Sequence, residues 1–209
     1  MSSYVDYSQP DLESFWRSGV MIWDEIKRYA SYIPARTGTV VEIGCGLGRV
    51  TRAMASEAGT VDAFDISPEM IDRAAIGAPA NVRFHVTSGD NLYPALSNSA
   101  ELVLAYLVFQ HLPNEQAYAR CLQEMVRVAK PGGKVVFTTS PRDWNAYALP
   151  LLRARAYAAK LLRSDGPKGL YRPEWTGIRP SAARTMGLSP IPLTMTALPN
   201  RRWLYCGTK

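Results

Sequence analysis

The chain has 209 residues, of which 47% are hydrophobic and 20% are charged. These proportions fit one globular domain of ordinary size and exclude a disordered chain. No apolar run approaches the ~20 residues of a membrane-spanning helix, and the first residues lack the layout of a secretion signal. The three cysteines are too far apart in the sequence to suggest a disulfide framework. We therefore expect a single-domain protein of the cytoplasm.

The formal net charge of +6 is unevenly distributed along the chain. Residues 1–150 contain 13 Lys and Arg against 16 Asp and Glu, whereas residues 151–209 contain 11 against 2. The basic C-terminal part can attract an anionic substrate or a nucleic acid, and it can equally be a solvated helix face.

The first predicted element is an amphipathic helix over residues 12–33, ended by Pro34. Strand-like and helix-like segments then alternate, which indicates an α/β fold with a mostly parallel sheet and helices on both faces. Strands are expected at 39–43, 60–64, 82–86, 102–106 and 134–139, and helices at 49–58, 68–76 and 115–129.

The pattern changes after Ser140, where a helical lid over about residues 144–186 is expected. Strands at 191–198 and 202–206 should form a closing hairpin around Pro199-Asn200. The single domain then consists of a cap helix (1–37), a cofactor-binding core (38–140), a substrate and lid region (141–190) and the hairpin (191–209).

The most informative motif follows the first predicted strand. Glycines at 44, 46 and 48 stand between that strand and a helix, so bare backbone and a helix N-terminus meet at one point. Such a point suits a nucleotide-bearing ligand, and it can also be a tight turn without a ligand. A dinucleotide fold would need a further glycine at Arg49, which argues against NAD or FAD.

Two acidic residues follow the next two strands. Asp65 ends the second strand, where its carboxylate can accept hydrogen bonds from both hydroxyls of a ribose. Asp90, followed by Asn91, comes after the third strand and can accept from an adenine amino group, although an ordinary turn would also explain it.

In these features the chain resembles the class I S-adenosylmethionine-dependent methyltransferases. The resemblance covers roughly residues 12–140 and implies a seven-stranded sheet of order 3-2-1-4-5-7-6 with an antiparallel last strand. It also implies S-adenosyl-L-methionine as cofactor, S-adenosyl-L-homocysteine as its product, and no metal. The matching segments are 42–48, Asp65 with 67–70, Gly89-Asp90, 102–113 and Pro131-Gly132-Gly133.

The resemblance also implies roles for the residues of the first two motifs. Gly44 and Gly46 would lie under the methionine portion of the cofactor, and Asp65 would hold the ribose. Ile66 would flank the adenine, and Met70 would close that pocket.

The remaining cofactor residues follow in the same way. Asp90 and Asn91 would reach the adenine edge, and Leu107 would line the methionine and methyl region. Glu42 would lie near the cofactor ammonium, and the N-terminal helix would bring Trp16 close to the site.

His111 is the candidate catalytic base, because it falls just after the fourth strand and its ordinary pKa of ~6.5 suits proton transfer. It can equally cap a turn or pack on the next helix. The segment lacks the Asn/Asp-Pro-Pro-aromatic pattern of amino-methylating DNA enzymes, and neither Cys45 nor Cys121 is placed as an attacking thiolate. These observations leave methylation of oxygen or nitrogen.

Candidate substrate residues, besides Trp16, lie in the stretch that matches no general motif. Trp144, Trp175 and Arg179 can clamp a planar or anionic acceptor, and each can equally belong to the core of a lid.

Taken together, the sequence predicts a methyltransferase that acts as a monomer or homodimer on a small-molecule acceptor, such as a biosynthetic intermediate or a secondary metabolite. The basic C-terminal part allows that acceptor to be anionic. Two alternatives stay open: an RNA methyltransferase that uses the basic C-terminal region, and a non-catalytic S-adenosylmethionine-binding protein.

Overall fold

Helices and strands alternate through most of the computed structural model, which describes residues 11–139, 194–198 and 202–209. The predicted lid and the residues Trp144, Trp175 and Arg179 lie outside these ranges. The elements, in chain order, are α1 (Leu12–Ala30), β1 (Thr39–Ile43), α2 (Arg49–Ala55), β2 (Thr60–Asp65), α3 (Pro68–Ala75), β3 (Val82–Val86), β4 (Ala100–Ala105), the short 3-10 helix η1 (Phe109–His111), α4 (Glu115–Val128), β5 (Ala129–Thr139), β6 (Thr194–Leu198) and β7 (Arg202–Thr208).

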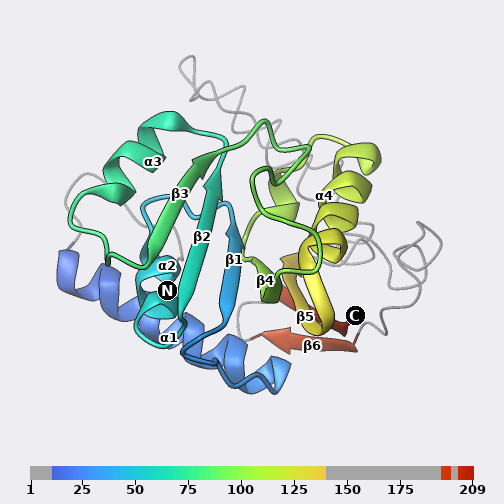
Figure 1. Cartoon of the computed structure of the whole chain (residues 1–209), viewed down its shortest axis with the longest axis horizontal. Helices are drawn as coiled ribbons and strands as arrows, with labels where there is room; N and C mark the ends of the chain where they lie inside the picture. The colour runs from blue at the N-terminus through green and yellow to red at the C-terminus, as the bar shows by residue number, and fades with distance from the viewer. Residues whose placement is uncertain (1–10, 140–193, 199–201) are drawn as a thin grey trace, which may run out of the picture.

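The strands form one sheet of order β3-β2-β1-β4-β5-β7-β6 (Figure 1). The pairs β2–β3, β1–β2, β1–β4 and β4–β5 are parallel, and β7 runs antiparallel to both β5 and β6. The α/β class, the mostly parallel sheet and this strand order are as predicted. The first four strands of the order therefore end at the same edge of the sheet, where parallel α/β folds place their ligands.

Helices cover both faces of the sheet. On one face, α1 and α2 pack on side chains such as Val40 and Leu104, while on the other α4 packs on neighbours such as Val41 and Val103. These strands are buried on both sides, which is why they read as nearly continuous apolar runs in the sequence. Among the described residues, no helix is long and apolar enough to cross a membrane.

Helix starts follow the capping residues in the sequence. Ser67 precedes Pro68 and accepts a hydrogen bond from the Met70 amide at 3.3 Å, and Asn114 accepts one from the Ala117 amide at 2.8 Å. Both caps place a helix N-terminus directly beside the carboxyl edge of the sheet.

Helix α1 ends earlier than predicted. Ser31 adopts a left-handed conformation with φ 48°, and the backbone amide of Tyr32 donates to the carbonyl of Lys27. The helix is therefore ended by a local left-handed cap three residues before Pro34.

Strand β5 begins five residues before the predicted start at Lys134. Ala129 already pairs with Ala100, and the register shifts before Leu102 pairs with Lys134. Helix α4 has already ended at Val128, so Pro131-Gly132-Gly133 lies inside β5 and forms an irregularity there. It is held by hydrogen bonds from the Gly132 amide to the Lys209 carbonyl and from the Lys209 amide to the Gly133 carbonyl.

Candidate functional site

A cavity of about 620 Å³ opens at the carboxyl edge of the sheet, a volume typical of small-molecule sites. It lies after the ends of β1, β2, β3 and β4, and η1 and α4 close its other side. The lining residues are Ile43, Gly44, Asp65, Ile66, Thr87, Ser88, Gly89, Asp90, Leu107, Val108, His111, Leu112, Pro113, Asn114, Gln116, Ala117, Arg120 and Cys121.

Asp65 is held in place by the backbone around it. Its Oδ2 accepts a hydrogen bond from the Gly46 amide at 2.8 Å, and its Oδ1 accepts one from the Ser67 amide at 3.0 Å. Each carboxylate oxygen can accept a further hydrogen bond, because an ionised carboxylate offers about four acceptor positions. The side chain is thus oriented and still able to bind two donors on a ligand.

The glycine turn presents bare backbone next to Asp65. Gly46 has φ 54°, and a Cβ built on it meets no atom within 4 Å, so open space adjoins the peptide at this point. Gly44 differs, because a Cβ there would lie 2.4 Å from Cγ2 of Val108. Gly44 is therefore small to admit Val108, whereas Gly46 leaves room that a ligand can fill.

Ile66 and Asp90 give this cavity an apolar and an acidic wall. Ile66 is 70% exposed although it is a large aliphatic residue, which leaves its side chain free to cover a ligand. Asp90 is exposed, and hydrogen bonding from Ser88, supported by Asn91, lowers the pKa of its carboxyl.

Leu107 carries the most unusual backbone at the cavity. It is a non-glycine residue with φ 63°, and its amide donates to Oγ1 of Thr138 at 2.7 Å. A left-handed conformation at a branched residue costs on the order of 1–3 kcal/mol, and such strain concentrates at functional sites. Here it directs the chain from β4 into η1, so that Val108 and His111 both reach the cavity.

Glu42 lies beneath the glycine turn, buried to 3% exposure. Oγ1 of Thr51 donates to its Oε2 at 2.5 Å. Burial raises the pKa of Glu42 to about 7, against a partial opposing effect of that hydrogen bond. The residue does not line the cavity.

His111 ends η1 and is exposed at the cavity rim. Its Nε2 lies 3.1 Å from Nε2 of Gln110, an arrangement in which the amide donates and the imidazole nitrogen accepts. Partial desolvation lowers the pKa of His111 below its usual value. The imidazole is therefore neutral at pH 7 and able to take up a proton.

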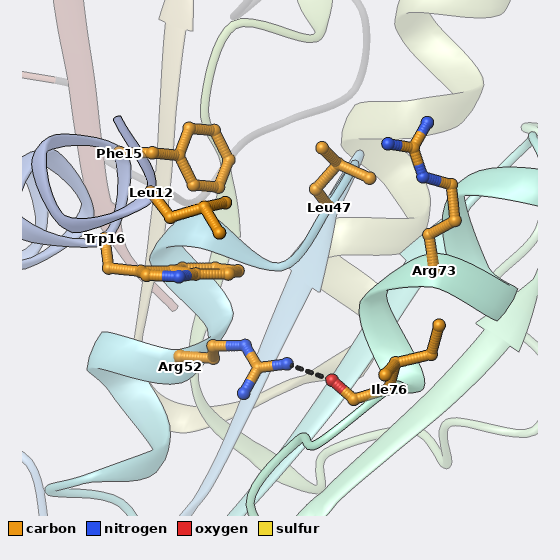
Figure 2. A pocket seen from close by; sticks show the side chains of 7 residues that line it. All are labelled: Leu12, Phe15, Trp16, Leu47, Arg52, Arg73 and Ile76. Carbon is orange, nitrogen blue, oxygen red and sulfur yellow. Dashed lines mark hydrogen bonds between the residues drawn. The ribbon is translucent and has the colours of Figure 1, made fainter. Parts of the chain in front are cut away.

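Three further predicted cofactor residues do not line this cavity: Gly46, Met70 and Asn91. The side-chain amide of Asn91 donates to Asp90 Oδ1 at 3.1 Å. Trp16 lines a different cavity, between α1, the glycine turn and α3, where the guanidinium of Arg52 lies 4.7 Å from its ring (Figure 2). That cavity shares no lining residue with the one at the sheet edge.

One wall of the sheet-edge cavity escaped the sequence interpretation. It is formed by the first two turns of α4, through Gln116, Ala117, Arg120 and Cys121. The steps of three and four residues among these positions mark one helix face, so the helix itself carried a usable signal. Which face meets the cavity depends on packing across the sheet, which the sequence pattern does not contain.

The two cysteines near the cavity are poor nucleophiles. Burial raises the pKa of the Cys121 thiol to about 12, and burial also raises that of Cys45 well above its usual range. Neither is a thiolate at neutral pH, which agrees with their exclusion as attacking groups. Within the described ranges, no three His, Cys, Asp or Glu side chains are grouped to hold a metal ion.

Comparison with known proteins points to one family. A family model described as a methyltransferase domain matches residues 41–137. The chain is 30% identical over 147 residues to the ubiquinone biosynthesis O-methyltransferase of Xanthomonas oryzae pv. oryzae (strain PXO99A), which covers 67% of this chain and 58% of that protein. The chain thus spans less than two thirds of the length of the curated relatives it matches.

Solved structures share the fold. The PH0226 protein from Pyrococcus horikoshii OT3 is 18% identical, with a TM-score of 0.67 over 100% of this chain and 95% of that one. The N-methyltransferase NodS from Bradyrhizobium japonicum WM9, in complex with S-adenosyl-L-homocysteine, is 16% identical with a TM-score of 0.60 over 93% and 87% of the two chains.

Proposed function

The chain belongs to the class I S-adenosylmethionine-dependent methyltransferases, and we propose that it moves a methyl group from S-adenosylmethionine to an oxygen atom of a small-molecule acceptor. The observation that carries this proposal is the cavity at the carboxyl edge of the sheet, with Gly44 and Asp65 on one side and His111 on the other. The open backbone of Gly46 adjoins Asp65, to which its amide donates. The O-methyltransferase names of the curated relatives support oxygen as the acceptor atom.

The cavity fits the adenosine part of this cofactor. The Asp65 carboxylate keeps acceptor capacity for two ribose hydroxyls, and the exposed Ile66 side chain offers an apolar surface to a flat base. Asp90, kept ionised by its neighbours, can accept from an amino group. Hydrogen bonds to a charged acceptor contribute roughly 1.5–3 kcal/mol each, so Asp65 should be a main source of affinity.

When bound, the sulfonium of the cofactor supplies an activated methyl group. The contribution of the protein is to orient the acceptor and exclude water, and positioning of this kind can supply on the order of 7–11 kcal/mol. The strained backbone of Leu107 brings η1 to the cavity rim, so we propose that His111 accepts the proton of an acceptor hydroxyl there. Glu42, beneath the turn, would lie toward the cofactor ammonium, with Met70 and Asn91 supporting the adenine side.

A methyl-transfer assay tests this proposal. The protein is incubated with methyl-labelled S-adenosylmethionine and a panel of phenols, matched anilines and small carboxylates. We expect label in one or more hydroxyl compounds. Label confined to amines would reject oxygen as the acceptor, and no transfer to any small molecule, with cofactor binding intact, would favour the non-catalytic alternative.

The role of His111 is tested by the pH dependence of turnover. Because its pKa is lowered, kcat should rise with pH through an inflection below 6.5 and then stay level. His111→Asn should lower kcat by about 10²–10⁴-fold, remove this inflection and leave cofactor affinity unchanged. An unchanged profile in the variant would remove His111 as the base.

A further inference from the structure

A second cavity of about 480 Å³ lies on the outer side of the glycine turn. Figure 2 shows its walls: residues of α1 on one side, residues of α3 on the other, and Leu47 of the turn above Arg52 between them. Its volume is within the range of small-molecule sites. The lining residues are Leu12, Phe15, Trp16, Leu47, Arg52, Arg73 and Ile76.

The lining of this cavity is positively charged. It contains two guanidinium groups, and none of its seven lining residues is acidic. Arg52 is fixed by its neighbours, since its Nη2 donates to the carbonyl of Ile76 at 2.7 Å and its guanidinium stacks on Trp16 at 4.7 Å. The guanidinium of Arg52 also donates to the carbonyls of Ala74 and Gly77. All of these partners are neutral, so none of them is a carboxylate that compensates the charge of Arg52.

Arg73 provides the second, more exposed positive charge. Its side chain is 54% exposed, and the nearest carboxylate recorded for it is Glu69 at 3.8 Å, itself 78% exposed. An exposed ion pair of this length contributes little, so Arg73 can exchange Glu69 for an incoming anion without a large loss. In Figure 2 its guanidinium lies across the cavity from the rings of α1.

The remaining walls are apolar. Leu12 is 63% exposed and Ile76 is 75% exposed, which is unusual for large aliphatic residues on neighbouring elements. The indole of Trp16 is already oriented by Arg52 on one side and projects toward the cavity (Figure 2). A flat apolar body can therefore contact Trp16 and these aliphatic side chains while its anionic group reaches Arg73.

We propose that this cavity is a second binding site, for a small molecule with an aromatic body and one carboxylate or similar anionic group. The site is separate from the sheet-edge cavity, with which it shares no lining residue, and it does not depend on the proposed methyl transfer. Its occupant would touch Leu47, which lies between Gly46 and Gly48 in the glycine turn.

The test uses two probes of nearly the same shape, 1-naphthoate and the neutral 1-naphthamide, titrated by calorimetry into the full chain. We expect one site at which 1-naphthoate binds roughly tenfold or more tightly than 1-naphthamide. Arg73→Gln should reduce the affinity for 1-naphthoate to near that for 1-naphthamide and leave 1-naphthamide binding unchanged. Arg17→Gln, on the exposed part of α1, should leave both affinities unchanged.

Two further measurements locate the probe. Trp16→Leu should weaken both probes, and saturating S-adenosylhomocysteine should not displace 1-naphthoate. The proposal is overturned if 1-naphthoate does not bind, if Arg73→Gln leaves its affinity unchanged, or if S-adenosylhomocysteine displaces it. Failure of S-adenosylhomocysteine to bind would count against the proposed function. The second site would then still be tested by whether Arg73→Gln weakens the binding of 1-naphthoate.

Discussion

At the scale of single residues, the buried carboxyl of Glu42 is expected to lower the stability of the folded protein at neutral pH. Its carboxyl is buried beneath the glycine turn with one hydrogen bond, from Thr51, and burial raises its pKa to about 7. Stability alone explains this placement poorly, because burial disfavours the carboxylate and the nearby charge of Arg49 offsets that effect only in part. A cationic ligand group above the turn would provide a further positive partner.

The pH dependence of stability tests this view of Glu42. In the unfolded chain the carboxyl loses its proton near 4.5, whereas in the folded protein it keeps it to about 7. The unfolded state therefore binds fewer protons in this window, so the free energy of unfolding should decrease by ~3 kcal/mol between pH 4.5 and 7 in the absence of cofactor.

Glu42→Gln should remove most of this decrease, as measured by urea unfolding at pH 5 and pH 8. Glu69→Gln, on the exposed surface of α3, serves as the matched control and should keep the wild-type dependence. If the two variants depend equally on pH, Glu42 does not carry the raised pKa.

Site residues could be predicted from the sequence where they directly follow the end of a strand. Asp65, Ile66, Asp90, Leu107 and His111 all line the sheet-edge cavity, because the carboxyl ends of parallel strands meet at one edge. Prediction was weakest where the placement depends on packing between helices. Trp16 lies one turn from where α1 crosses α2, and that crossing directs it to the second cavity.

At the scale of elements, the crossing of α1 and α2 rests on Gly19. A Cβ built on this residue would lie 2.1 Å from the backbone oxygen of Arg49, the first residue of α2. The two helices therefore approach more closely than any side chain would allow. This contact positions both Trp16 on α1 and Arg52 on α2.

Gly19→Ala is accordingly expected to destabilise the protein by about 1–3 kcal/mol, the usual cost of overpacking, as measured by urea unfolding. In an open helix the same change would stabilise by ~1 kcal/mol, because alanine is the better helix former. The sign of the change in the free energy of unfolding therefore shows whether Gly19 lies at a close helix contact. A stabilised variant would contradict the close approach of the two helices.

Elements with strong hydrophobic patterning were predictable, whereas their ends were less so. The five parallel strands appear in the sequence as apolar runs because both faces of the sheet are covered. The early start of β5 was missed because its first residue pairs with Ala100 across an irregularity that Lys209 stabilises. Such contacts join distant parts of the chain, and no local pattern records them.

At the scale of the whole molecule, the distribution of charge leaves two classes of acceptor to be separated by experiment. The basic excess lies in residues 151–209, outside the acidic cofactor-binding half. A small-molecule enzyme needs no extended track of phosphate contacts, whereas an RNA enzyme would lose affinity steeply with salt as those contacts release counterions.

The two classes separate when methyl-labelled cofactor is supplied together with total RNA and a metabolite extract at ~150 mM salt. We expect the label to appear in the small-molecule fraction. Pretreatment of the mixture with ribonuclease should leave incorporation unchanged. Label recovered in RNA, and lost after that treatment, would replace the small-molecule interpretation with the RNA alternative.

The central claim is that the glycine turn and Asp65 hold S-adenosylmethionine, and calorimetry with S-adenosylhomocysteine tests it most directly. We predict one site in the wild-type protein and a loss of affinity of roughly 100-fold or more in Asp65→Ala, with two hydroxyl hydrogen bonds removed. Asp72→Ala, which removes an exposed carboxylate of α3, should bind as the wild type does. Unchanged affinity in a folded Asp65→Ala, or tight binding of NAD in place of S-adenosylhomocysteine, would contradict the account.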